Sequence, residues 1–456
     1  MADSERQRPN VIFVLTDDQG PWAAGCYGND EIRTPNIDRL AATGIRFDRF
    51  FVATPVCSPS RATYLTGRIP SQHGIHEWIS EGNIGPGATR YLEGEVAFTD
   101  IMAQHGYTCG ISGKWHMGDS LHPQHSFDFW YVHQEGAGPY NDAPMVRDGQ
   151  AITEPGYITD VITDEALGFI DRNSDRPFYL YVAYTAPHAP WTGHPQDIVD
   201  SYDDCPFNSC PQEPRHPWAE ELTDRCLGNR EMLKGYFAAV TAMDNNLGRI
   251  IDRVEELGLR ENTLFIFASD NGFSCGHHGF WGKGNGTYPR NMYENSIRVP
   301  LVFSQPGTVP QGAVESGMFS AYDFAPTLLD YLGLPLPEGR NLPGSSFAPA
   351  LYGQPVSGRE MVAIYDEYGP ARMIRTEEWK YVHRYPDGPH DLFDLVNDPD
   401  ERVNLASDPA YTQRAWDLKA QMDEWFDRYV EPATDGLQHR RDPRWPAGEY
   451  HAFPVQ

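Results

Sequence analysis

Short apolar runs alternate with helical patterns over the first two-thirds of the chain. This alternation is typical of β-α-β units, in which parallel strands form one sheet that helices cover on both faces. We therefore predict a large α/β domain with strands at residues 11–16, 107–111, 178–184, 264–268 and 301–303. Helices are predicted at residues 35–43, 229–257 and 321–332.

The pattern changes from about residue 359 onward. Three short apolar stretches at residues 361–365, 373–376 and 379–382 are typical of hairpin strands, and a helical pattern follows at 413–429. We predict a small α+β subdomain with an antiparallel sheet and a closing helix. The predicted domains are residues 1–355 and 356–456.

The charge balance restricts the possible partners. The chain has 36 Lys and Arg against 64 Asp and Glu, which gives a formal net charge of −28. A surface this acidic repels nucleic acid and anionic membranes, so we predict neither as a partner. It also repels anionic substrates, and a pocket for an anion would need cationic groups concentrated within it.

The first ten residues are polar and lead directly into the apolar residues 11–15. This apolar run is too short for the core of a signal peptide or for a membrane span. A secretory precursor trimmed to a new initiator Met would look the same. The sequence therefore leaves the compartment open between the cytoplasm and export with a trimmed signal.

Seven cysteines are scattered along the chain. An odd number without regular spacing does not form a disulfide framework in a chain of this length, and we expect reduced thiols. A zinc site made of Cys205, Cys210, His216 and Cys226 is an alternative, although it lacks the paired spacing of such sites. A proline-rich loop fits this segment better, with a Cys205–Cys210 disulfide if the protein is exported.

Polar side chains follow two of the predicted strands at the point where each strand ends. Asp17 and Asp18 come directly after the first strand, and Asp270 and Asn271 follow a later one. Ligands bind beyond the carboxyl ends of strands in open parallel sheets, and parallel neighbours would bring these ends together. Three carboxylates and one amide suit a hard divalent cation. Taken alone, Asp17-Asp18 is equally good turn chemistry.

The segment Cys57-Ser58-Pro59-Ser60-Arg61 precedes a short helical pattern that ends at Gly67. Pro59 suits the first turn of a helix, where its missing N–H costs nothing. Cys57 would then lie at the positive end of the helix, a location that favours an anion or a nucleophile. For a cysteine considered alone, a small buried apolar side chain is the more common interpretation.

Cys57 to Arg61, with the pattern Cys-x-Pro-x-Arg, resembles the signature of the type I sulfatases of the alkaline phosphatase superfamily. The resemblance covers nearly the whole chain: residues 11–20 look like the family's metal-binding first strand, 34–38 like its first helix and 373–405 like its C-terminal subdomain. It implies an alkaline-phosphatase-like fold, with a large mixed, mostly parallel sheet flanked by helices. Residues 1–355 would form the catalytic domain.

The resemblance also implies roles for individual residues. Cys57 would be oxidised after synthesis to formylglycine by a maturation enzyme, and Arg61 would hold the formylglycine hydrate. In Gly113-Lys114-Trp115-His116, Lys114 and His116 would contact the sulfate and the formylglycine, and His188 would face the leaving oxygen. Lys283 would be a second sulfate-binding lysine, although residues 284–292 separate it from the Tyr293-Glu294 pair that follows more closely in many relatives.

The implied cofactor is Ca²⁺, with Mg²⁺ or Mn²⁺ as alternatives, held by Asp17, Asp18, Asp270, Asn271 and the modified Cys57. A hydrated aldehyde offers one oxygen that attacks sulfur and a second that expels the product. His188 or His116 would protonate the departing alcohol. The sequence thus predicts hydrolysis of a sulfate monoester.

Two other functions remain open from the sequence. One is a phosphonate monoester or phosphodiester hydrolase of the same superfamily, although Asn271 favours sulfate because the phosphatase-like relatives more often have His there. The other is a non-catalytic metal-binding homologue that never receives formylglycine.

Family resemblance makes a carbohydrate sulfate the expected substrate. Loop residues that could line a sugar subsite are His73, His76, Trp78, Trp191, His277, His278 and Arg290. The basic segment 439–445 could pack on an acidic neighbour in a homo-oligomer.

Overall fold

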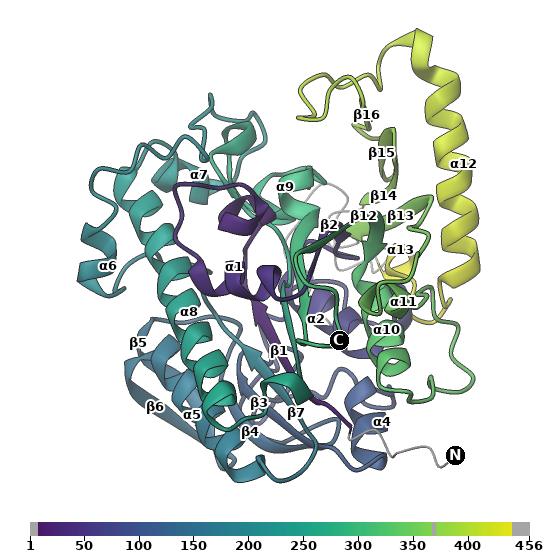
Figure 1. Ribbon diagram of the computed structural model, residues 1–456. Coiled ribbons are helices and arrows are strands. Elements are labelled where there is room, and N and C mark those ends of the chain that lie inside the picture. Colours follow the sequence, from purple (N-terminus) through teal and green to yellow (C-terminus); the bar gives the residue numbers. More distant parts are fainter. Residues whose placement is uncertain (1–7, 367–370, 440–456) are drawn as a thin grey trace.

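The computed structural model describes residues 8–366 and 371–439 (Figure 1). Residues 440–445 of the basic segment proposed for subunit contact lie outside the described residues. A ten-stranded sheet forms the centre, in the order β12 (Ala313–Ser320), β2 (Ile45–Phe51), β11 (Arg298–Ser304), β8 (Thr263–Ser269), β1 (Asn10–Thr16), β7 (Phe178–Ala183), β3 (Thr108–Gly113), β4 (Phe127–His133), β5 (Asn141–Arg147) and β6 (Gln150–Tyr157).

The middle of this sheet is parallel. β1 pairs in parallel with β7 on one side and with β8 on the other, and β3 pairs in parallel with β7 and β4. Antiparallel pairs join β11 to β8 and β2, and β5 to β4 and β6. The predicted mixed, mostly parallel sheet is therefore confirmed. All five predicted strands are present, with their ends shifted by at most three residues.

Helices cover both faces of the sheet, because successive side chains of each central strand point to opposite sides. In β1, Phe13 and Leu15 belong to one apolar core, which α2, α4 and α10 cover. Ile12 and Val14 belong to a second core beneath α1, α5 and α8. Figure 1 shows these two helical layers on either side of the sheet.

The larger helices agree with the predicted pattern. The helices before the C-terminal sheet are α1 (Pro35–Ala42), α2 (Cys57–Thr66), α3 (Pro70–His73), α4 (Phe98–Gln104), α5 (Ile158–Asn173), α6 (Gln196–Asp200), α7 (Glu221–Cys226), α8 (Arg230–Glu256), α9 (Glu294–Ile297), α10 (Phe324–Tyr331) and α11 (Ala348–Leu351). The side chain of Asn229 caps α8 by accepting a hydrogen bond from the N–H of Glu231. The predicted helix at 321–332 begins as a 3-10 turn and becomes α-helical only at Phe324.

A second, four-stranded sheet follows in the order β13 (Met361–Asp366), β14 (Ala371–Thr376), β15 (Trp379–Arg384) and β16 (Asp391–Asp394). Its strands pair antiparallel, as predicted. α12 (Thr412–Tyr429) packs on it through Leu418, Met422 and Phe426, and α13 (Gly436–His439) follows. The predicted domain boundary at 355/356 falls in the segment between α11 and β13.

Two further strands are short: β9 (Ser274–Cys275) and β10 (Trp281–Gly282) form a small hairpin just before Lys283.

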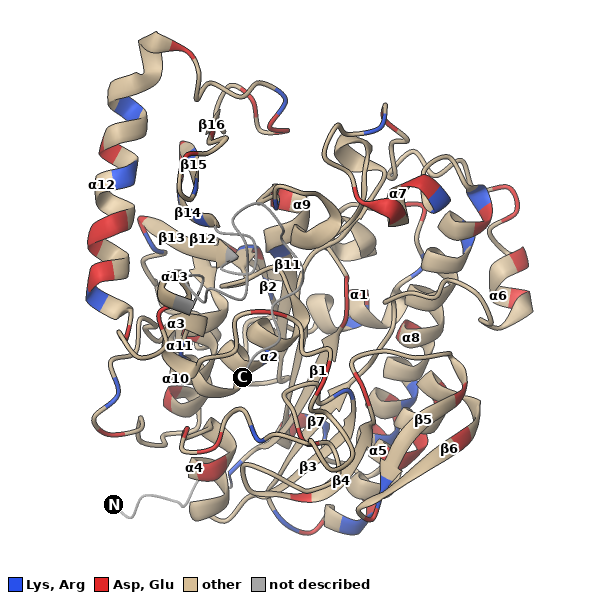
Figure 2. Ribbon diagram, turned by 180° about the vertical axis from the view of Figure 1, so that it is seen from behind, with Lys and Arg blue, Asp and Glu red and all other residues tan. Residues whose placement is uncertain are grey.

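Figure 2 shows Asp and Glu on many surface elements, among them α6, α7 and α12. Among the described helices, none has both the length and the apolar character needed to cross a membrane.

Candidate active site

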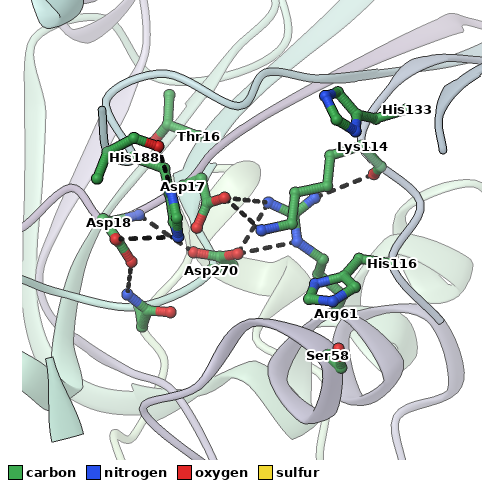
Figure 3. A network of polar contacts seen from close by, with 12 residues as sticks. Thr16, Asp17, Asp18, Ser58, Arg61, Lys114, His116, His133, His188 and Asp270 are labelled. Carbon is green, nitrogen blue, oxygen red and sulfur yellow. Dashed lines mark hydrogen bonds and ion pairs between the residues drawn. The ribbon is translucent and has the colours of Figure 1, made fainter. Parts of the chain in front are cut away.

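The acidic residues at the ends of β1 and β8 lie side by side (Figure 3). The two strands are parallel neighbours in register up to their last residues, so both chains leave the sheet at the same edge. The N–H of Asp18 donates to Oδ1 of Asp270 at 3.3 Å. Nδ2 of Asn271 donates to Oδ1 of Asp18 at 2.7 Å. The structure thus brings Asp17, Asp18, Asp270 and Asn271 into one buried group.

Two acceptor atoms in this group have no hydrogen-bond partner among the described residues, namely Oδ1 of Asp17 and Oδ1 of Asn271. Asp17, Asp18 and His188 also offer three ligand atoms within 4.8 Å of one another. No other three His, Cys, Asp or Glu side chains gather this closely in residues 8–366 and 371–439. Buried acceptors without a donor are costly, and a hard cation with oxygen ligands satisfies them. The carboxylate and amide oxygens therefore fit a hard divalent cation.

Cationic side chains from three other segments surround the carboxylates. Arg61 is fully buried and donates from Nε to Oδ2 of Asp270 at 2.8 Å. Nζ of Lys114 forms a short contact with Oδ2 of Asp17. Burial alone would raise the pKa of Asp17, but nearby cations, above all Lys114, hold it well below its usual range. Burial and the charge of Asp17 raise the pKa of Asp270 above its ordinary value.

Gly113 determines where Lys114 can lie. Its φ is +118°, and a Cβ at this position would lie 1.9 Å from the carbonyl oxygen of Ala183 at the end of β7. Only glycine allows this close approach of β3 to β7. The N–H of Lys114 then donates to the same carbonyl at 2.7 Å, which places the lysine at the edge where β1 and β8 end.

Lys283 reaches the site from the segment after the β9–β10 hairpin. Its Nζ donates to Oδ1 of Asp18 at 2.6 Å. Burial alone would lower the pKa of Lys283, but Asp18 raises it well above its ordinary value. The following loop, residues 284–293, is held at both ends. Nδ2 of Asn291 donates to the carbonyl of Lys283 at 3.0 Å.

The far end of this loop is tied to the C-terminal sheet by two cations of β15. Nζ of Lys380 donates to the carbonyl of Met292 at 2.9 Å. Nε and Nη2 of Arg384 donate to the carbonyl of Arg290 at 3.0 and 2.8 Å. The small sheet therefore positions the loop that follows Lys283.

Cys57 is the first residue of α2, and the whole helix is buried. Its thiol lies beside the cationic group, because Cys57 lines the same cavity as Lys114 and Lys283. Oγ of Ser58 accepts a hydrogen bond from the N–H of Ile79 at 3.1 Å. The start of α2 is thereby joined to residues 78–80, which form one wall of the cavity.

Two histidines face this cavity in different states. Nε2 of His116 lies 2.9 Å from the carbonyl of Ile79, and its buried Nδ1 has no partner among the described residues. Burial, with the charge of Lys114, lowers the pKa of His116 well below its ordinary value. His188 is more open, with Nδ1 2.8 Å from the carbonyl of Ala189 and Nε2 3.9 Å from Oδ2 of Asp18.

These side chains meet in a cavity of about 480 Å³. Its inner part contains Cys57 and the cationic and imidazole groups described above. The rest of the lining, here called the outer part, consists of residues 78–80, residues 135–137 and Asn285. The cavity thus joins Lys114 and Lys283, which could contact a tetrahedral anion, with space for a larger organic group.

Sequence comparison decides the family. The sequence profile of the sulfatases matches residues 9–334, and a profile described as N-sulphoglucosamine sulphohydrolase, C-terminal, matches residues 276–428. The chain belongs to the sulfatase family. The resemblance found in the sequence is therefore confirmed, and the chain is a sulfuric ester hydrolase of the alkaline phosphatase superfamily.

Several relatives of this sulfatase act on sulfated sugars. It is 28% identical to an N-acetylglucosamine-6-O-sulfatase from Bacteroides thetaiotaomicron, over 94% of this chain and 88% of that one. It is 31% identical to an N-acetylgalactosamine-6-sulfatase from Canis lupus familiaris, over 77% and 68% of the two chains. A solved structure of the protein BT4656 in complex with its substrate D-glucosamine-2-N,6-O-disulfate has a TM-score of 0.79 at 26% identity, and covers 94% of this chain and 99% of that chain.

Four of the residues suggested for a sugar subsite lie elsewhere in the sulfatase. Trp191 is buried in an apolar cluster, 5.1 Å from Trp281 between ring centroids. Nε2 of His277 contacts the carbonyl of Ser209, and the ring of His278 stacks on Tyr293. Arg290 donates to carbonyls of its own loop. None of the four lines the cavity, because local packing occupies each side chain.

Of the three other residues suggested for the sugar subsite, one lines the cavity and two do not. Trp78 does line the cavity, whereas His73 is buried beside Thr63 and His76 is also absent from the cavity wall.

The zinc alternative is not supported, because Cys205, Cys210, His216 and Cys226 form no cluster of ligand atoms in the described residues. All seven cysteines have free thiols, so the Cys205–Cys210 disulfide is absent from this structure.

Residues 135–137, which line the cavity, were not predicted from the sequence. Residues 135–137 follow β4, a parallel neighbour of β3 whose carboxyl end lies at the same edge as those of β1 and β8. The apolar run Phe127–His133 followed by Gln-Glu-Gly was the available signal. Asn285 was missed as well, although the unusual length of its loop was noticed.

Proposed function

We propose that this sulfatase hydrolyses a sulfate monoester on a saccharide, with a formylglycine made from Cys57 and a Ca²⁺ ion held by Asp17, Asp18, Asp270 and Asn271. One observation carries the proposal: Cys57 begins a buried helix at the same cavity floor that gathers Lys114 and Lys283. The names of the sugar-sulfate relatives support the substrate class.

The two groups supply chemistry that the unmodified chain lacks. Formylglycine provides a hydrated aldehyde as nucleophile, and the cation neutralises charge on sulfate oxygens. The residues of the chain prepare the site for both. Arg61 pairs with Oδ2 of Asp270 and so offsets one of the buried negative charges. Lys114 and Lys283 would exchange their contacts with Asp17 and Asp18 for sulfate oxygens when substrate and cation are bound.

The two histidines have different roles. The carbonyl of Ile79 accepts from Nε2 of His116, so its Nδ1 carries a lone pair and can accept a hydrogen bond in the site. The carbonyl of Ala189 accepts from Nδ1 of His188, which leaves Nε2 facing the site. Nε2 lies 3.9 Å from Oδ2 of Asp18, and His188 is the general acid for the departing alcohol.

The test is mass spectrometry of the tryptic peptide 50–61 together with activity on para-nitrophenyl sulfate. We expect the aldehyde form of Cys57 in every active preparation, and C57A should lose turnover by several orders of magnitude while keeping the wild-type melting temperature. An active preparation with only unmodified thiol would refute the mechanism. Parallel assays on an aryl phosphodiester and a phosphonate ester distinguish this function from that of a phosphoester hydrolase.

A further inference from the structure

The outer part of the cavity contains an unexpected carboxylate. Of the described residues that line the cavity, Glu135 alone is acidic. It shares the cavity lining with Lys114 and Lys283, and no Lys, Arg or His of the described residues forms an ion pair with it. Burial raises the pKa of Glu135. A ligand in the cavity could therefore supply a donor to this carboxylate.

The carboxylate is fixed in place rather than loosely exposed. Oε2 accepts a hydrogen bond from Nδ2 of Asn83 at 3.0 Å, and Asn83 is buried and also donates to the carbonyl of Ile79. The backbone N and O of Glu135 lie 3.3 and 3.1 Å from Nδ1 of the buried His133. No hydrogen bond to Oε1 is formed within the described part of the chain. One oxygen is therefore held by the protein and the other is available.

The surroundings of Glu135 suit the body of a sugar. Trp78 and Ile79 supply an aromatic and an apolar surface, and Gly136 and Ala137 add two small residues to the lining. Asn285 adds an amide from the loop after Lys283. Apolar walls with a few placed polar groups are typical of sites that orient a small organic ligand.

We propose that Glu135 selects the leaving group: Oε1 accepts a hydrogen bond from a hydroxyl or ammonium group of the alcohol whose sulfate lies against Lys114 and Lys283. The same charge repels a second sulfate at that position. This inference rests on the proposed function and narrows it to sugars that carry a donor, and not a further sulfate, beside Glu135.

The experiment compares E135Q with the wild type. Substrates are glucose and glucosamine sulfates with one sulfate, the same sugars with a second sulfate at each available position, and para-nitrophenyl sulfate. E135Q keeps the shape of the side chain but removes the charge. We expect kcat/KM on the best singly sulfated sugar to fall about tenfold to a hundredfold, which is the range for loss of a charged hydrogen bond. The loss should be smaller on the aryl ester, which has no donor, and at least one doubly sulfated sugar should gain relative to its singly sulfated counterpart.

Comparing glucose with glucosamine sulfates distinguishes the two possible donors, a hydroxyl and an ammonium group. A loss confined to the amino sugar identifies an ammonium partner, and an equal loss on both sugars identifies a hydroxyl. The matched control is E81Q, which removes the same charge from an exposed carboxylate outside the cavity and should keep the wild-type selectivity. E135D retains the charge, but its shorter side chain holds the carboxylate farther from the ligand. It should therefore change the ratios between the substrates in the same direction as E135Q, but less.

Unchanged ratios between the substrates in both Glu135 variants would overturn the inference, and so would an equal loss on sugars and on the aryl ester. A failure of the proposed function would look different. The wild-type enzyme with confirmed formylglycine would then hydrolyse neither the sugar sulfates nor the aryl sulfate.

Discussion

The packing of Gly136 against His116 makes a single methyl group a sharp perturbation. A Cβ at residue 136 would lie 2.2 Å from Cε1, 2.3 Å from Nε2 and 2.6 Å from Nδ1 of the His116 ring. The ring must therefore move and lose its 2.9 Å contact with the carbonyl of Ile79. Overpacking of this kind costs about 1–3 kcal/mol of stability, and the lost hydrogen bond about 1 kcal/mol, part of the same total.

G136A should reduce activity as well as stability. Because His116 lies in the cavity beside Cys57, a displacement of about 1 Å can cost on the order of a hundredfold in kcat/KM. Urea denaturation and turnover of para-nitrophenyl sulfate measure the two effects. G87A is the matched control, since no atom lies within 4 Å of a Cβ at Gly87. If G136A keeps wild-type kcat/KM and stability, the contact does not position the ring.

Two further predictions concern the metal and acid pH. Ca²⁺ at about a hundred times its Kd should stabilise the wild-type protein by about 2.7 kcal/mol in thermal melts. D270N should lose most of this gain. A wild-type protein whose stability does not respond to Ca²⁺ or Mg²⁺ would contradict the assigned site. Burial lowers the pKa of His194 to about 4, below its unfolded value of about 6.5. As the pH falls, the unfolded chain therefore binds the extra proton first. The free energy of unfolding should fall as pH drops from about 6.5 to 4, by at most about 3 kcal/mol from this group. Urea denaturation at several pH values should show a shallower fall for H194Q, and identical pH profiles would contradict the reasoning.

The sequence predicted those parts of the site that follow directly from buried strands. Residues 264–268 form a continuous apolar run, and the polar residues after it mark where the strand ends. A parallel sheet then brings Asp270 to Asp17 without any further information. The short helix after Cys57 was similarly visible, because Pro59 and Gly67 mark its two ends.

The sequence could not show which loop side chains enter the cavity. Trp191 looked suitable for a sugar, but Gly235 lets α8 approach so closely that a Cβ there would lie 2.0 Å from the carbonyl of Trp191. The tryptophan is therefore enclosed in the core. Glu135 shows the opposite case, because its role depends on Asn83, which is distant in the sequence. Edge strands such as β6, whose residues alternate in exposure, lacked the apolar run used to find the central strands.

The two cations of β15 have a consequence for recombining related enzymes. Lys380 and Arg384 hold the backbone of the loop that begins after Lys283, so this loop and the C-terminal sheet share one set of contacts. A chimera that joins one sulfatase's catalytic domain to another's C-terminal sheet would take the two sides of these contacts from different parents. Exchanging residues 283–293 together with 379–391 keeps both sides from one parent, so the loop after Lys283 keeps its support.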